Sequence, residues 1–556
     1  MKLFRLTLLF AIALPLAAQS PKPAPATAEA RAAHALEAAK KAGALELYAL
    51  LKNFPKGADL HMHLSGAIYA ETFLAEGAKQ GLCVDKTALA FAQPGDKGKC
   101  AGGQLTASDA LQNQGLYDKL IDSFSMRSFV PYAGYSGHDQ FFDTFNRFGG
   151  LQNVQGEWLD EVATRAAAQN EQYLEIMQTP SFNNAIAAAN KVGWPKGAEE
   201  SVTYEQLATL RTALLAAGLR NDIAIDTKEF ADAKEQRNAI ENCAAYESFE
   251  KQMADYPGDM KPLSHPLARE MEDASTSNGC SVHIHWLYQV LRGFSPQQVF
   301  AQTLLGFEVA SADPDVVGIN FVRAEDRRDA MEEYNLEMQM LDYLHSIYPK
   351  VHISLHAGEL APGLVPPDGL SFHIREAVEL GHAERIGHGV DVLHESNTKD
   401  NGLIREHLVP LLKEMADKHI DVEVNLTSND VILGVKGTEH PLHAYMAAHV
   451  PFSLSTDDEG VSRIDLTHEY VKAVEEQNLS YADLKYSARN SLEYSFLHGE
   501  SLYSHPGDYT HRAAACAAPI TANPSSACTA FLSANEKAAQ QYELERRFAA
   551  FEAGLY

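Results

Sequence analysis

The stretch Ala58-Asp59-Leu60-His61-Met62-His63-Leu64 is short and largely apolar, and a polar loop and a helix-like segment follow it. Later stretches of the chain repeat this arrangement. Such alternation is typical of parallel α/β folds, and eight units favour a (β/α)₈ TIM-type barrel, with an open doubly wound sheet as the alternative. The seven further strand candidates are residues 172–178, 280–288, 316–322, 351–356, 385–390, 420–426 and 451–456.

The strand candidates are unevenly spaced, because about 110 residues separate the first from the second, and a similar number the second from the third. Connections within compact domains are usually much shorter, so these gaps predict two insertions, at about residues 80–130 and 180–280. We expect the barrel with its insertions to occupy residues 57–497.

The two ends of the chain predict helical extensions outside the barrel. Residues 28–51 are rich in Ala, Leu, Glu and Lys and predict one or two helices within an N-terminal extension, residues 19–56. Residues 498–556 predict a loop followed by a helix over 533–553, which is rich in Ala, Glu and Arg.

The first residues indicate export. Lys2 and Arg5 precede an apolar run that ends in the small residues Ala17 and Ala18, a pattern that predicts a signal peptide over residues 1–18. The run is too short to span a bilayer, and no later segment is long and apolar enough to do so. We therefore expect a periplasmic or secreted protein without a membrane anchor after cleavage.

The charge balance indicates the kind of partner. The chain has 556 residues, and 46 Lys plus Arg against 74 Asp plus Glu give a net charge of −28. Without any basic run, this balance argues against binding nucleic acid through a positive field. A small-molecule partner is the better expectation. The oligomeric state stays open, with a homodimer as one option.

Six cysteines gain meaning in an exported chain, where oxidising conditions let an even number pair. Fifteen connectivities are possible, and proximity favours nearest neighbours. None has the Cys-x-x-Cys spacing of a zinc site. The expected pairs are Cys83 with Cys100, Cys243 with Cys280, and Cys516 with Cys528.

Polar residues that matter in such a barrel stand at the carboxyl ends of the strands. His61 and His63 lie two residues apart and point to the same face of the first strand, although a lone His-x-His is more often two half-buried histidines. Further histidines and carboxylates end three other strands, and burying them together is costly unless a metal or a substrate uses them. The expected zinc ligands, with room for a water, are His61, His63, His356 and Asp457, and Glu359 and His388 remain for proton transfer.

With these motifs the chain resembles the adenosine deaminases, in particular their secreted, growth-factor-related branch, over about residues 54–497. The resemblance rests on four motifs in the family's order. They are Pro55-Lys56-Gly57-Ala58-Asp59-Leu60-His61-Met62-His63-Leu64-Ser65-Gly66, His356-Ala357-Gly358-Glu359, Arg385-Ile386-Gly387-His388-Gly389 and Ser453-Leu454-Ser455-Thr456-Asp457-Asp458.

The resemblance implies one zinc per chain on the four ligands named above, and hydrolysis of adenosine, 2′-deoxyadenosine or a related purine to the inosine product and ammonia. It implies that Glu359 gives a proton to purine N1 and that His388 orients or deprotonates the attacking water. Asp458 would meet purine N7. Phe141 and Phe142 resemble the hydrophobic lid of the family, with ordinary core aromatics as an equal alternative. Further substrate contacts implied in this way are Gly358, Ser65 and Ser428.

Two positions depart from the family pattern. Ser65 stands where Asp is common, which alters a contact to the ribose, and Arg323 stands where a Gly lets the purine approach the backbone. The alternatives are another mononuclear-zinc amidohydrolase and a secreted, non-catalytic binding or growth-factor-like protein. Residues 316–321 contain no Lys to bridge two metals, which favours one metal. The Pro-Cys-x-x-Cys signature of cytidine-type deaminases is absent from the sequence.

Overall fold

The computed structural model describes residues 27–243, 279–395 and 404–555. The predicted signal peptide lies outside these ranges. Within them, eight parallel strands form one sheet in the order β1-β5-β6-β7-β8-β9-β10-β11. The strands are β1 (Gly57–His63), β5 (Glu171–Gln178), β6 (His283–Leu291), β7 (Val316–Val322), β8 (His352–Ala357), β9 (Arg385–His388), β10 (Asp421–Val424) and β11 (Phe452–Leu454).

The two edges of this sheet approach each other at β1 and the segment after β11. The Asp457 N–H donates to the His61 carbonyl at 2.8 Å, and Met62 forms a parallel bridge with Asp457. The sheet is therefore a nearly closed (β/α)₈ barrel, and the predicted fold class is confirmed.

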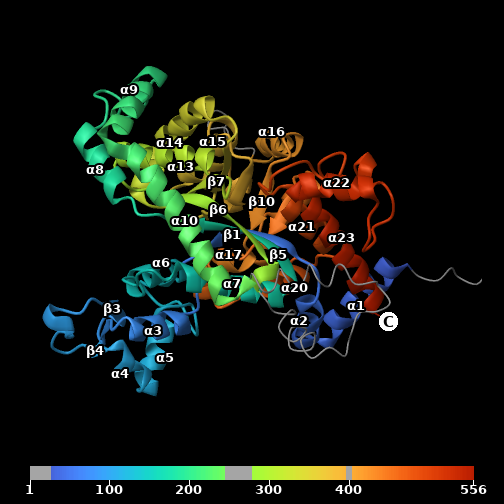
Figure 1. Cartoon of the computed structure of the whole chain (residues 1–556), viewed down its shortest axis with the longest axis horizontal. Helices are drawn as coiled ribbons and strands as arrows, with labels where there is room; N and C mark the ends of the chain where they lie inside the picture. The colour runs from blue at the N-terminus through green and yellow to red at the C-terminus, as the bar shows by residue number, and fades with distance from the viewer. Residues whose placement is uncertain (1–26, 244–278, 396–403, 556) are drawn as a thin grey trace, which may run out of the picture.

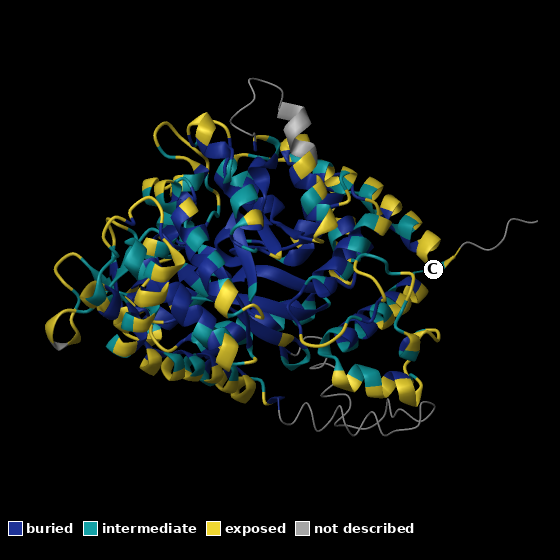
Figure 2. Ribbon diagram, turned by 90° about the horizontal axis from the view of Figure 1, so that it is seen from above, coloured by how far each residue is buried: buried dark blue, intermediate teal, exposed yellow. Residues whose placement is uncertain are grey.

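Helices surround the barrel, and Figure 2 shows its strands as the buried centre, with exposed residues on the outer faces of the helices. Strands that are covered on both sides need continuous apolar runs, which is why they were readable in the sequence. The helices that follow the strands are α7 (Gln155–Ala168), α13 (Pro296–Ala312), α14 (Arg328–Ile347), α15 (His373–Glu379), α16 (Ile404–Asp417), α17 (Leu426–Leu433), α18 (Leu442–Ala447), α19 (Glu459–Ser462), α20 (Leu466–Glu476) and α21 (Tyr481–Glu493).

The first long connection, between β1 and β5, contains a small antiparallel sheet in the order β3-β2-β4 and several helices, and it lies apart from the barrel in Figure 1. A disulfide between Cys83 and Cys100 closes it, as predicted. Its elements are α3 (Ala70–Lys79), β2 (Cys83–Asp85), β3 (Ala90–Ala92), β4 (Leu105–Thr106), α4 (Ala107–Leu111), α5 (Gln114–Ser123) and α6 (Gly137–Arg147).

The second long connection, between β5 and β6, contains α8 (Asn183–Val192), α9 (Tyr204–Leu214) and α10 (Arg220–Ile240). The predicted disulfide joins Cys243 to Cys280. The predicted start of the next strand was wrong by three residues, because Gly279–Ser281 forms a short 3₁₀ turn and β6 begins only at His283. An apolar run cannot distinguish a tethered turn from the start of a strand.

The two ends of the chain pack side by side in Figure 1. The N-terminal helices are α1 (Ala28–Ala42) and α2 (Ala44–Lys52), which separate at a glycine with a φ of 119°. The helix predicted over 533–553 is present as α23 (Glu536–Gly554), but its predicted start was three residues too early. Asn535 is extended and separates α23 from a further helix, α22 (Ser526–Ala534). The side-chain oxygen of Asn535 accepts the Glu500 N–H at 2.8 Å.

Two further predictions concern the third disulfide and membrane-spanning segments. The third predicted disulfide joins Cys516 to Cys528, and both sulfur atoms lie in a small apolar cluster with Leu502, Tyr503 and Tyr542. Among the helices of the described ranges, none is both long and apolar enough to cross a membrane.

Candidate metal centre and active site

Three imidazoles from two strands meet at the carboxyl end of the barrel. His61 and His63 point to one face of β1, as a period of two requires, and His356 projects from β8. The Nε2 of His356 lies 3.1 Å from that of His61 and 3.3 Å from that of His63. The strand ends therefore place three ring nitrogens around one point.

The carboxylate of Asp457 completes this group. Its Oδ1 lies 3.3 Å from His63 Nε2 and 3.8 Å from His61 Nε2. Although burial opposes the charge, the hydrogen bond with His63 and the neighbouring imidazoles hold the pKa of Asp457 below its usual range. Asp457 has a φ of 61°, and Asp59 fixes this turn by accepting the Thr456 N–H at 3.1 Å.

Each of the three imidazoles is oriented by an acceptor on its other nitrogen. Glu423 lies 2.6 Å from Nδ1 of His61, Gln289 lies 2.8 Å from that of His63, and Asn320 lies 2.7 Å from that of His356. An acceptor on Nδ1 places the ring proton there and leaves the Nε2 lone pair facing the centre, as in metal-binding histidines.

Glu423 is itself held by a buried cation. Its Oε1 accepts from Arg385 Nε at 2.6 Å, and Arg385 also pairs with Glu175 at 2.7 Å. Burial opposes the charge of Glu423, but the charge of Arg385 lowers its pKa to about 2. Glu423 is therefore anionic and a strong acceptor for the His61 ring.

The chemistry of the donor set fits zinc. The ligand atoms of His61, His63, His356 and Asp457 all lie within 4.8 Å of one another. Three imidazole nitrogens and one carboxylate oxygen suit a zinc that keeps a further position for water. The predicted ligands are thus together, and each of their side chains is almost completely buried.

Glu359 lies beside this group, two residues after β8. Its Oε1 is 3.6 Å from His388 Nδ1, and its side chain lines the cavity described below. Burial, followed by the charge of Asp457, raises the pKa of Glu359 well above its usual range. This shift favours the protonated form of the carboxyl group, which can donate a proton.

The hydrogen-bond network around His388 determines which of its nitrogens carries a proton. The Leu442 N–H donates to His440 Nδ1 at 3.2 Å, so the neutral His440 ring has its proton on Nε2. That nitrogen is 3.1 Å from Asn429 Oδ1, and Asn429 Nδ2 then donates to His388 Nδ1 at 3.0 Å. Because burial lowers the pKa of His388 to about 3, the neutral ring presents an Nε2–H, 3.9 Å from Asp457.

Three of the predicted metal ligands, His63, His356 and Asp457, line a cavity of about 530 Å³. Ser65 and Asp458 also line it, as do Phe141 and Phe142 from α6. Asp458 fits closely against Gly66, where a Cβ atom would lie 1.4 Å from its carboxylate. A cavity of this size suits a small organic molecule with an aromatic part.

Arg323 also lines this cavity, but its guanidinium group binds backbone carbonyl groups. It donates to the carbonyls of Arg292 and Gly293, both at 3.2 Å, and it lies over the ring of Phe294. Arg323 has a φ of 107°, a conformation that a glycine adopts at lower cost.

Two residues implied as substrate contacts have other partners. The Gly358 N–H donates to Glu325 at 2.9 Å, and the Ser428 hydroxyl donates to Asp457 Oδ2 at 2.6 Å. Neither lines the cavity, so Ser428 fixes a predicted metal ligand and Gly358 fixes the turn before Glu359.

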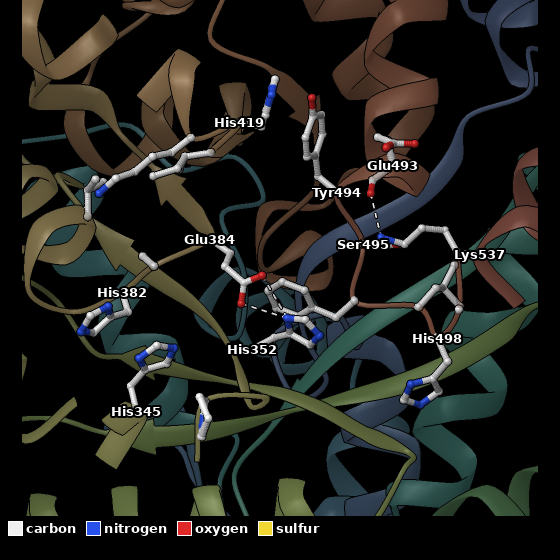
Figure 3. A pocket seen from close by; sticks show the side chains of 18 residues that line it. His345, His352, His382, Glu384, His419, Glu493, Tyr494, Ser495, His498 and Lys537 are labelled. Atoms are coloured by element: carbon white, nitrogen blue, oxygen red, sulfur yellow. Dashed lines mark hydrogen bonds and ion pairs between the residues drawn. The ribbon is translucent and has the colours of Figure 1, made fainter. Parts of the chain in front are cut away.

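A second cavity, of about 690 Å³, lies at the opposite end of the barrel, where β8, β9 and β10 begin. Figure 3 shows two interactions among its polar groups: His352 pairs with Glu384 at 2.9 Å, and Lys537 donates to the Glu493 carbonyl at 2.9 Å. None of the predicted site residues lines this cavity.

The residues that the sequence did not reveal are those that orient the ligands. Gln289 and Asn320 lie inside apolar strands, and only their position near the carboxyl ends of β6 and β7 sets them apart. Glu423 follows the same rule in β10. A polar residue that interrupts an apolar strand is the signal that could have identified them.

Comparisons with known proteins point to one family. Residues 268–502 match the family described as adenosine deaminase. An adenosine deaminase of Shewanella loihica is 36% identical over 146 residues, 26% of this chain and 38% of that protein. The adenosine deaminase of Escherichia coli is 35% identical over 150 residues, 27% of this chain and 39% of that protein. The chain thus spans about two fifths of the length of these curated relatives.

A solved structure, adenine deaminase from Arthrobacter aurescens, aligns with 80% of this chain and 94% of its own. The TM-score is 0.44 and the sequence identity is 16%.

Proposed function

We propose that this chain, a relative of the adenosine deaminases, is a zinc-dependent hydrolase that replaces the exocyclic amine of a purine nucleoside by oxygen. The observation that carries the proposal is the meeting of His61, His63, His356 and Asp457 next to a cavity that Glu359 also lines. We propose adenosine or 2′-deoxyadenosine as substrate, with the inosine product and ammonia released.

Bound to the four ligands, zinc would act as a Lewis acid and lower the pKa of a bound water to about 7. Glu359 supplies a proton to the ring, because addition of water to an aromatic amine leaves negative charge on the purine. A buried, protonated carboxyl group at N1 neutralises that charge as it forms.

His388 has the role of a donor in this proposal. Since its neutral ring presents Nε2–H, it orients the attacking water and stabilises the charge that develops on it. The family resemblance allows His388 either to orient the attacking water or to deprotonate it. The hydrogen bonds through Asn429 and His440 agree better with orientation. Asp458 is the proposed contact to N7, and burial followed by the charge of Asp457 raises its pKa so that it can donate.

Phe141 and Phe142 support a planar base as ligand, because their apolar side chains line the cavity together with its polar residues. Ser65 lines the same cavity and is proposed to contact the sugar. We further propose export through residues 1–18, membership of the growth-factor-related branch, and the barrel boundaries 57–497 given above.

A substrate screen tests the proposal. The purified mature protein, incubated with adenosine, 2′-deoxyadenosine, adenine and adenosine monophosphate, should decrease the purine absorbance of at least one nucleoside. We expect turnover in the ordinary range for enzymes, about 1–10³ s⁻¹. Inactivity on all four compounds would favour another hydrolase or a binding protein instead.

A further inference from the structure

The turn from His356 to Glu359 carries a predicted metal ligand and the predicted proton donor. Its backbone is held by a carboxylate that lines no part of the cavity. Glu325 Oε2 accepts the Gly358 N–H at 2.9 Å. Glu325 is 2% exposed, so water does not compete for this bond.

A buried arginine holds the other side of the same turn. Arg292 Nη2 donates to the His356 carbonyl at 3.2 Å and lies 3.5 Å from Glu325 Oε1. Both side chains are almost wholly buried, which is costly for two charges. The pair therefore connects the Gly358 amide group with the carbonyl of the ligand His356.

The loop that carries Glu325 is bent to reach the turn. Two residues before it, Arg323 adopts a φ of 107°, which is unfavourable for a side chain other than glycine. Its guanidinium bonds to the carbonyls of Arg292 and Gly293 hold this bend. Strain of this kind persists where the surrounding structure fixes it, and often at functional sites.

We propose that Glu325 is a positioning residue for the reaction: it binds the Gly358 N–H and, with Arg292, holds the turn so that the Glu359 carboxyl group stays at the cavity wall. It acts through the backbone and touches no substrate. The inference rests on the proposed function, since that function makes Glu359 the proton donor.

Glu337 in α14 provides a matched control. It is 1% exposed, and the charge of Arg292 acts on it as on Glu325. Among the described residues, however, no group hydrogen-bonds its carboxylate. Glu337→Gln therefore removes a buried carboxylate beside Arg292 without removing a bond to the turn.

The test compares Glu325→Gln with Glu337→Gln as zinc-loaded proteins. Glu325→Gln should lower kcat by about 10–10²-fold, since a catalytic group misplaced by about 1 Å can lose that much. KM should change by less than about threefold, and the zinc content should stay at one per chain, because neither depends on the Glu359 carboxyl group. Glu337→Gln should keep kcat within about threefold of the parent protein.

Amide hydrogen exchange gives a readout that does not depend on turnover. In Glu325→Gln the peptide that contains Gly358 and Glu359 should exchange at least about tenfold faster, because the single oxygen of the Gln amide cannot serve both the Gly358 N–H and Arg292 as the two oxygens of Glu325 do. In Glu337→Gln its exchange should be unchanged. Faster exchange without activity in the parent protein would retain the positioning role and reject the proposed function. Equal exchange and equal kcat in both variants would overturn the inference.

Discussion

Glu359→Gln should retain its zinc and still bind a purine nucleoside, while its kcat falls by about 10²–10⁴-fold, the loss typical of a positioned acid. Gln keeps the size and the hydrogen-bonding capacity of Glu but cannot supply a proton. The effect should be large because the carboxyl group is buried, and burial raises its pKa and so favours the protonated form. Steady-state kinetics measure the fall in kcat, and elemental analysis of the same sample measures the zinc content.

Glu384→Gln is the control for this substitution. Glu384 lies at the other end of the barrel and pairs with His352. The kcat of Glu384→Gln should therefore match that of the parent protein. Near-normal kcat in Glu359→Gln with zinc in place would show that the proton comes from another group.

His356→Ala should lose its zinc and, with it, turnover by about 10³-fold or more, because metal polarisation contributes several kcal/mol to such a transition state. The Nε2 of His356 lies within 3.3 Å of the Nε2 atoms of both His61 and His63, so its removal takes a ligand atom from the middle of the group. Metal content after dialysis and turnover of adenosine measure both effects.

His373→Ala is the matched control for this loss. His373 is also fully buried, but it lies in α15 outside the metal group. It should lose stability and keep its zinc. A full complement of zinc in His356→Ala would remove this residue from the ligand set.

The strands could be predicted from the sequence because each is a short, apolar run that is buried on both faces. Every one of the eight predicted ranges overlaps a strand of the barrel. Errors arose where tertiary contacts decide a boundary. The turn at Cys280 and the break at Asn535 depend on a disulfide and on a bond to Glu500, and neither partner is close in the sequence.

The metal group was predictable because each ligand ends a strand, and the barrel brings the strand ends together. The orienting groups interrupt apolar strands, which marks them in the sequence, but their individual roles depend on distances between strands. Ser428 illustrates the difference: the family resemblance implied a substrate contact, but its hydroxyl group donates to Asp457. Glu325 likewise acts on a turn 33 residues away in the sequence.

The most direct test of the central claim is a zinc titration of the metal-free protein with adenosine as substrate. The account predicts that chelation abolishes turnover and that added zinc restores it in proportion until one zinc per chain is bound, with no further gain beyond that ratio. Full turnover in protein that holds no zinc, or a rise that continues to two zinc ions per chain, would contradict it.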